Sequence, residues 1–304
     1  MAGICEDRVV VVTGAGRGLG RSHALEFARQ GARIVVNDLG TEVDGSGASG
    51  GPAAAVVDEI RSLGGEAVVS TEDVSDSRGA QRLVETAIEA YGSLDTLVNN
   101  AGILRDRMLV NMSDDEWDDV IRVHLRGTFN PSRFAATFWR ERAKSGHDND
   151  GRIINTSSAT GLYGNPGQIN YATAKGGIAA FTVVAAQELG RYGVMVNAIA
   201  PMAVTRMNAN LPFGEQASSS VESLMVPESV SPLVAWLGSS RSKGVTGRIF
   251  NVHSGYISVA EGWRAGPSAN TGKRWDVDEV DRTVPGLLAQ ARPTTDISGV
   301  VAAL

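Results

Sequence analysis

The sequence predicts an α/β protein whose core is a doubly wound parallel sheet of about seven strands with helices on both faces. Apolar, β-branched runs alternate with stretches whose apolar residues recur at helical spacing, from residue 8 to residue 252. The strand runs are apolar at nearly every position, which is typical of strands buried on both faces. No repeat or linker divides residues 1–255, so we expect one domain there and an extension of uncertain structure over 256–304.

The elements follow in a regular order along the chain. Strands are expected at 8–13, 33–37, 67–70, 94–99, 152–156, 194–199 and 248–252. Helices are expected at 18–30, 53–63, 80–91, 114–144, 169–191 and 228–237. Ser113 and Glu116 form the pattern of a capping box, and Pro131 should kink or interrupt the helix that follows. Residues 201–226 have no clear period, which indicates either disordered chain or a functional lid.

Composition excludes several classes of protein. The 304 residues include 28 Lys plus Arg and 34 Asp plus Glu, so the net charge of −6 gives no electrostatic basis for binding nucleic acid or an anionic membrane. No apolar stretch is long enough to cross a bilayer. Cys5 is the single cysteine, which excludes an internal disulfide and a paired-cysteine metal site. We therefore expect a cytoplasmic protein without a metal.

A glycine-rich turn between the first strand and the first helix predicts a nucleotide site of the Rossmann type. The string Thr13–Gly20 lets the backbone approach a pyrophosphate, whose charge the helix N-terminus then stabilises. Asp38 ends the second strand 18 residues after Gly20, where an acid binds the adenosine ribose hydroxyls, although an ordinary turn aspartate is the alternative. Its carboxylate would repel a 2′-phosphate and favours NAD, whereas Arg17 could pair with that phosphate.

A second constellation carries the chemistry. Tyr171 and Lys175 are four residues apart on one helix face, and Ser158 lies 13 residues before Tyr171 at a strand end. An ammonium and a positive nicotinamide ring would favour the phenolate, so Tyr171 can exchange a proton with a hydroxyl or carbonyl. Ser158 would hold the same oxygen while a hydride passes to the cofactor.

Taken together, these strings resemble the short-chain dehydrogenase/reductase family over about residues 5–255. The matching strings are Thr13–Gly20, Asn99-Asn100-Ala101-Gly102, and Tyr171 and Lys175 with Ser158. The resemblance implies that Ser158, Tyr171 and Lys175 are catalytic. It further implies a cofactor-binding set of Gly14, Arg17, Gly18, Leu19, Gly20, Asp38, Asp73, Val74, Asn100, Ala101, Gly102, Tyr171, Lys175 and Val204.

Two positions depart from the family pattern. His124 stands where the family usually has a catalytic asparagine, on an apolar helix face that favours a satisfied core histidine. Met202 follows Pro201 where glycine is usual. Residues 36–40, 102–106, 123–127 and 161–165 are similar to the dehydrogenase unit of peroxisomal multifunctional enzyme type 2, and the third string includes His124.

That narrower resemblance implies NAD-dependent oxidation of a (3R)-hydroxyacyl-CoA in a β-oxidation-type pathway. The alternatives are a dehydrogenase or reductase of a steroid or other small alcohol, and a nucleotide-sensing module without turnover. Arg105, Arg107 and Arg206 are candidates for contacts with CoA phosphates, although exposed arginines are more often solvated. The two long helices, 114–144 and 169–191, predict a homodimer or homotetramer.

Overall fold

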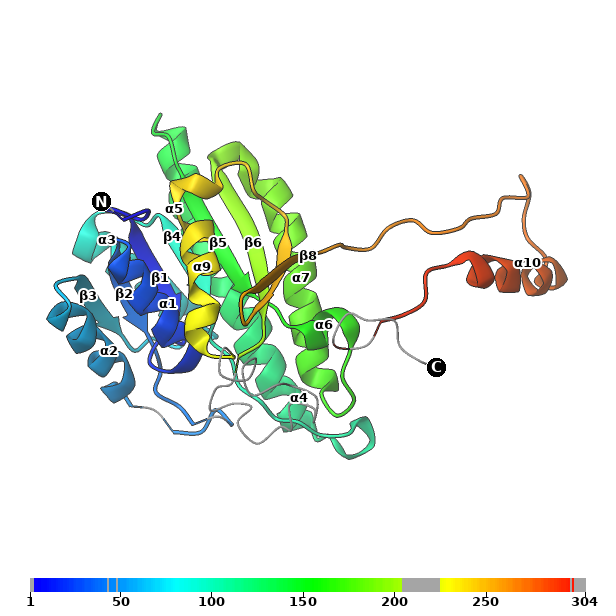
Figure 1. Ribbon diagram of the computed structural model, residues 1–304, viewed down its shortest axis with the longest axis horizontal. Coiled ribbons are helices and arrows are strands. Elements are labelled where there is room, and N and C mark those ends of the chain that lie inside the picture. The colour runs from blue at the N-terminus through cyan, green and yellow to red at the C-terminus, as the bar shows by residue number, and fades with distance from the viewer. Residues whose placement is uncertain (1–2, 43, 48, 204–224, 296, 298–304) are drawn as a thin grey trace.

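The computed structural model describes residues 3–42, 44–47, 49–203, 225–295 and 297. Its centre is one eight-stranded sheet with the order β3-β2-β1-β4-β5-β6-β7-β8 (Figure 1). Neighbouring strands pair in parallel as far as β7, and β8 is antiparallel to β7. The strands are β1 Val9–Thr13, β2 Arg33–Asn37, β3 Glu66–Ser70, β4 Thr96–Asn99, β5 Gly151–Thr156, β6 Val194–Pro201, β7 Ile249–His253 and β8 Tyr256–Ala260.

Helices cover both faces of the sheet. They are α1 Gly18–Arg29, α2 Gly51–Ser62, α3 Ser77–Tyr91, α4 Asp114–Ile121, α5 Gly127–Lys144, α6 Ala159–Tyr163, α7 Ile169–Leu189, α9 Ser231–Gly238 and α10 Val277–Gln290. Because successive side chains of a strand point to opposite faces, Val10 and Val12 of β1 pack with α1, α2 and α9. Val9 and Val11 pack on the other face with α3, α5 and α7. The predicted doubly wound architecture is confirmed.

The expected count of about seven strands was one too low, because β8 lies in the predicted extension. Ser254 and Gly255 have φ values of 42° and 81°, a combination typical of a two-residue hairpin turn. The turn brings Tyr256 opposite His253 and Ala260 opposite Ile249. Beyond β8, α10 begins with a capping box between Asp276 and Glu279, has no buried residue, and lies away from the sheet (Figure 1).

Pro131 was expected to kink or interrupt its helix, and the interruption does not occur. α5 runs from Gly127 through Pro131 to Lys144. The interruption comes earlier, at a π-helical segment over Arg122–Arg126 that joins α4 to α5. The capping box of Ser113 and Glu116 before α4 is confirmed.

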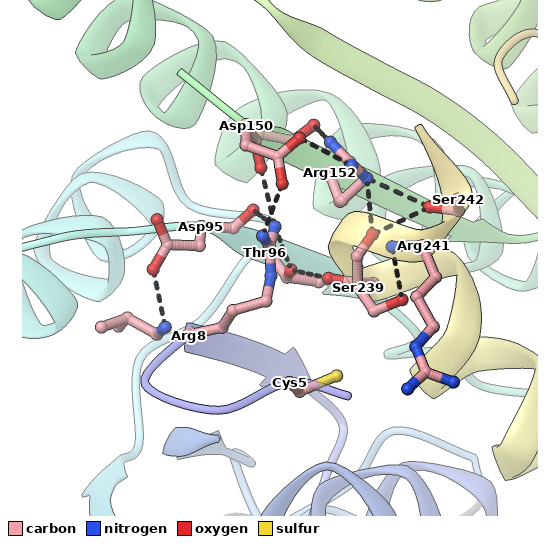
Figure 2. A network of polar contacts seen from close by, with 12 residues as sticks. Cys5, Arg8, Asp95, Thr96, Asp150, Arg152, Ser239, Arg241 and Ser242 are labelled. Atoms are coloured by element: carbon pink, nitrogen blue, oxygen red, sulfur yellow. Dashed lines mark hydrogen bonds and ion pairs between the residues drawn. The ribbon is translucent and has the colours of Figure 1, made fainter. Parts of the chain in front are cut away.

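A polar network ties the strands together at the amino edge of the sheet (Figure 2). Arg152 of β5 is buried and donates to the carbonyl oxygen of Ser239 at 3.1 Å and to the Ser242 hydroxyl at 3.1 Å. Asp150 forms ion pairs with Arg152 at 2.7 Å and with Arg8 at 2.8 Å. The network lies at the end of the sheet opposite the strand ends that carry the predicted site.

The structure also shows the surroundings of the single cysteine and the character of the helices. Cys5 is buried, and burial raises the pKa of its thiol to about 11, so the thiol stays protonated at neutral pH. Among the described residues, no helix is both long and apolar enough to cross a membrane.

Candidate active site

A cavity of about 720 Å³ opens at the carboxyl edge of the sheet, beside the point between β1 and β4 where the strand order reverses. It gathers residues from the loops that follow six strands, β1 to β6. The predicted site residues that line it are Gly14, Arg17, Gly18, Leu19, Gly20, Asp38, Asp73, Val74, Asn100, Ala101, Gly102, Ser158, Tyr171 and Lys175. Val204 lies outside the described residues. The structure thus brings together every described residue of the predicted site.

The glycine-rich turn packs tightly against the loop after β4. Gly14 has a φ of 62°, and a Cβ added there would lie 2.8 Å from the Cα of Ala101. A Cβ on Gly20 would lie 2.1 Å from the carbonyl oxygen of Gly14. The hydroxyl of Thr13 accepts the backbone N–H groups of Asn100 at 2.9 Å and Ala101 at 3.1 Å. The two loops therefore form one wall of the cavity, with the backbone close to any bound nucleotide.

Asp38 is held in place by the backbone on both sides. Its Oδ2 accepts the N–H of Gly16 at 2.7 Å, and its Oδ1 accepts the N–H of Gly40 at 2.6 Å. Arg17 donates to the carbonyl oxygen of Thr41 at 3.2 Å, so its cation stays near the same end of the cavity. The Asp38 carboxylate and the Arg17 guanidinium therefore both lie at the end of the cavity where the ribose is expected. Asp38 is the more firmly oriented of the two, because two backbone N–H groups bind it.

The three predicted catalytic residues meet where α6 packs on α7. A Cβ added to Gly161 of α6 would lie 2.5 Å from the Cβ of Lys175, so only glycine permits this approach. Ser158, the N-cap of α6, thereby comes within hydrogen-bond reach of the Tyr171 side chain. Lys175 donates to the carbonyl oxygen of Thr156 at 2.6 Å and lies 5.5 Å from the Tyr171 ring centroid.

Burial dominates the protonation of this group. It raises the pKa of Tyr171 to about 12. The hydrogen bond with Ser158 offsets part of this increase, and the charge of Asp106 adds to it. Burial lowers the pKa of Lys175 to about 7. The expectation that Lys175 lowers the pKa of the phenol is not met by the protein's own groups. The phenol is protonated at neutral pH unless a further positive charge comes beside it.

A polar cluster that the sequence did not predict lies beside Tyr171. Gln168 donates from its amide to Asp106 at 2.7 Å and accepts from Asn165 at 2.8 Å and from the Thr160 hydroxyl at 3.2 Å. Burial raises the pKa of Asp106. Gln168 lines the cavity as the N-cap of α7, three residues before Tyr171, and a polar residue at the start of that helix could have indicated it.

The arginines proposed for CoA contacts are already paired where the structure describes them. Arg105 forms an ion pair with Asp119 at 3.0 Å, and Arg107 forms one with Glu116 at 3.0 Å. Arg206 lies outside the described residues. The geometry therefore does not favour Arg105 or Arg107 as phosphate ligands.

Comparison with known proteins decides the family. A family model described as short chain dehydrogenase matches residues 8–216, the span that carries the glycine turn and the Ser158, Tyr171 and Lys175 group. The chain belongs to this family. It is therefore an oxidoreductase that acts on CH–OH groups, and the family uses NAD or NADP.

Individual relatives cover different shares of this short-chain dehydrogenase. It is 43% identical to the hydroxyacyl-CoA dehydrogenase ChsB1 of Mycobacterium tuberculosis, over 96% of this chain and 92% of that one. It is 46% identical to mouse peroxisomal multifunctional enzyme type 2, over 83% of this chain but 32% of that longer protein. A crystal structure of a short chain dehydrogenase from Mycobacterium avium aligns with a TM-score of 0.87 and 53% identity, over 99% of this chain and all of that one.

Proposed function

We propose that this dehydrogenase oxidises a (3R)-hydroxyacyl-CoA to the 3-oxoacyl-CoA with NAD, in a β-oxidation-type pathway. The observation that carries the proposal is the Ser158, Tyr171 and Lys175 group at one wall of a cavity whose other wall is the nucleotide turn and Asp38. The substrate class is supported by relatives named as a hydroxyacyl-CoA dehydrogenase and as peroxisomal multifunctional enzymes. The chain spans about a third of the mouse protein, so the remaining activities of that protein are not transferred.

The residues have distinct roles in this reaction. Ser158 holds the C3 oxygen of the substrate by a hydrogen bond, and Tyr171, in its phenolate form, accepts the proton of the C3 hydroxyl. A bound NAD would supply the acceptor for the hydride on C3 and the positive charge that favours the phenolate. Lys175, fixed by the carbonyl oxygen of Thr156, keeps a donor beside the phenol and would bind the nicotinamide ribose of the cofactor.

NAD rather than NADP is proposed because Asp38 would repel a ribose 2′-phosphate. The two backbone N–H groups that bind its carboxylate oxygens hold it at the cavity wall. Arg17 is the competing cation, but its guanidinium donates to the carbonyl oxygen of Thr41 in the neighbouring loop. A wild type with the higher kcat/KM for NADP would contradict this assignment.

The test is a substrate panel with NAD, followed by the absorbance of NADH. The panel contains (3R)- and (3S)-hydroxyacyl-CoA thioesters and a CoA-free steroid alcohol at matched concentrations, with Tyr171→Phe as the control. We expect the (3R) thioester to give the highest kcat/KM. A preference for the steroid alcohol would favour the alternative dehydrogenase, and a chain without any Tyr171-dependent turnover would favour the nucleotide-sensing module.

The proposed assembly is a homodimer or homotetramer through α5 and α7. A groove of about 470 Å³ runs between their outer faces, and it includes Phe129 and Val184, which are 46% and 52% exposed. Exposed apolar side chains of this kind on neighbouring helices are typical of a subunit interface. A monomer by light scattering at micromolar concentration would contradict this assembly.

A cytoplasmic location stays a prediction, since relatives include peroxisomal proteins.

A further inference from the structure

The chain beyond β8 leaves the body of the molecule and comes back to it. Residues 261–295 and Ile297 form this arm, which runs out to α10 and returns toward the sheet (Figure 1). Ile297 lines the active-site cavity together with Thr160 of α6. The arm is therefore joined to the body at both ends, at β8 and at the cavity, and α10 lies between them.

α10 has one apolar face, and the body of this chain leaves that face exposed. Its apolar residues recur three or four positions apart, which places them in one stripe along the helix; they are Val277, Val280, Val284 and Leu288. These residues are between 41% and 84% exposed. Asp278 and Arg282 lie on the other side of the helix. No residue of α10 is buried, so the stripe still lacks a surface to pack on.

The sequence of α10 does not favour a helix that stands alone. The helix has 14 residues, and helices of this length are marginal in water even when they are built from strong helix formers. Three of its residues are β-branched valines, and Pro285 and Gly286 lie in its interior. Pro285 also has no N–H to donate to the carbonyl oxygen of Asp281. We therefore expect α10 to be helical only when its stripe is packed against another surface.

Apolar side chains are exposed at the base of the arm as well. Ile257 and Val259 of β8 are 56% and 48% exposed, and their spacing of two points both to the same face of the sheet. Trp263 follows three residues after β8 and is fully exposed. Large apolar side chains that gather on one surface mark a contact with another molecule. The apolar surface thus begins at β8 and continues into the arm.

The length and position of the arm favour a second copy of this chain as that molecule. A stable interface uses roughly 20–30 residues from each side, and the arm is longer than this. Two copies related by a two-fold axis can each cover the arm of the other, so that every arm is packed whenever the assembly forms. A transient partner would leave α10 uncovered for part of the time.

The charge of α10 argues against a lipid surface. Asp278, Glu279 and Asp281 outnumber the single cation of the helix, Arg282, and an anionic bilayer would repel them. The alignment with the Mycobacterium avium crystal structure covers 99% of this chain and therefore extends over the arm. A chain of the same fold thus carries an equivalent segment.

We propose that the arm packs on a second copy of this chain through the apolar stripe of α10, and that this contact holds Ile297 at the active-site cavity. The body of each copy anchors the two ends of its own arm, and the partner supplies the surface that α10 lacks. Loss of the contact would release Ile297, so the assembly completes the wall of the cavity. The inference goes beyond the proposed reaction, and only the effect on the substrate rests on that reaction.

The partner of α10 is identified by photo-crosslinking in the full chain. Cys5 is buried and its thiol is protonated at neutral pH, so a cysteine introduced on α10 can be labelled selectively. Val284→Cys, labelled with a benzophenone maleimide and irradiated at micromolar concentration, should give a covalent product of two chains. Arg282→Cys, on the other side of the same helix, is the matched control and should give much less. The absence of a two-chain product, or equal yields from the two positions, would overturn the proposal.

The need for a packed stripe is tested by hydrogen exchange of the α10 amides, followed by mass spectrometry. Val280→Gln combined with Val284→Gln should increase their exchange rate about tenfold or more. Glutamine forms helices at least as readily as valine, so a faster exchange would report the lost contact and not a weaker helix. Asp278→Gln combined with Arg282→Gln keeps the net charge and should leave the rate unchanged. Wild-type protection in the valine variant would overturn the proposal.

The link to the cavity is tested by the KM of the substrate. The paired valine substitutions and Ile297→Ala should each raise this KM about threefold to tenfold, because both remove the same apolar contact from the cavity wall. All three substitutions together should raise it no further than Ile297→Ala alone. Effects that multiply, or a wild-type KM in the valine variant, would overturn the link. If the chain oxidises a steroid alcohol instead of the thioester, the proposed function fails, while crosslinking and exchange, which need no substrate, still decide whether the arm contacts a second copy.

Discussion

The carboxylate of Asp150 is shared by two arginines at the amino edge (Figure 2), and Asp150→Asn should destabilise the fold. One oxygen pairs with Arg8 at 2.8 Å and the other with Arg152 at 2.7 Å. The Arg152 side chain is 1% exposed, and that of Arg8 is 12% exposed. Burial lowers the pKa of Arg152, and Asp150 offsets part of this effect. The substitution leaves two guanidinium groups facing one another across a neutral amide.

The magnitude follows from the burial of the partners. Removing one partner of a fully buried ion pair costs about 3–5 kcal/mol. Asp150 is itself 44% exposed, so water screens the pair and the expected loss falls to about 2 kcal/mol. Arg152 also keeps its bonds to the Ser239 carbonyl and the Ser242 hydroxyl. For a chain of this size the loss corresponds to a decrease in Tm of about 4 °C.

The assay is urea unfolding followed by tryptophan fluorescence, to which the buried Trp139 contributes, with exposed Asp148→Asn as the control. In an Arg152→Met background, which removes the buried charge, Asp150→Asn should cost markedly less than in the wild type. Activity at low temperature should be unchanged, because the network lies opposite the cavity. A free energy of unfolding within about 0.5 kcal/mol of the wild type for Asp150→Asn would refute the reasoning. Additive effects of the two substitutions would refute it as well.

Three further outcomes are expected. Tyr171→Phe should abolish turnover but leave NADH binding, measured by fluorescence titration, unchanged. Lys175→Ala should weaken both turnover and NADH binding. A wild-type rate for Tyr171→Phe would exclude the proton-transfer role. Asp38→Ser should narrow the ratio of kcat/KM for NAD over NADP, and an unchanged ratio would count against the acid. Burial lowers the pKa of both His23 and His124 to about 3, so the unfolded chain binds their protons first as pH falls below about 6.5. The free energy of unfolding should therefore fall between pH 6.5 and 4, and less so for His23→Asn in parallel urea titrations.

The carboxyl edge of the sheet could be predicted from sequence because its signals are local. The glycine turn, Asp38 and the Tyr171–Lys175 pair each need only their own strand end or helix turn to be recognised. Parallel strands then bring these segments to one edge without further information. This is why the described members of the predicted set line one cavity, although their individual roles stay predictions.

Contacts between distant segments could not be read in the same way. Gln168 meets Asp106 across 62 residues, and nothing in either local pattern requires the pairing. Arg152 occupies a strand that looks apolar, and its counter-ion precedes that strand in a turn. β8 was missed because the pattern around Ser254 and Gly255 indicates the end of a domain as readily as a hairpin turn. In each case the deciding partner lies in another element.

His124 shows where helical periodicity stops being informative. The apolar spacing of its helix correctly predicts a buried side chain, but it also favours a histidine whose hydrogen bonds are satisfied. In the structure the helix widens at Arg122–Arg126, and Nδ1 of His124 has no partner among the described residues. The buried face here is the wall of the cavity, formed by Gly102 and Tyr171, rather than the general core. Periodicity reports burial and not what a residue is buried against, so the sequence alone could not place the His124 ring at the wall of the cavity.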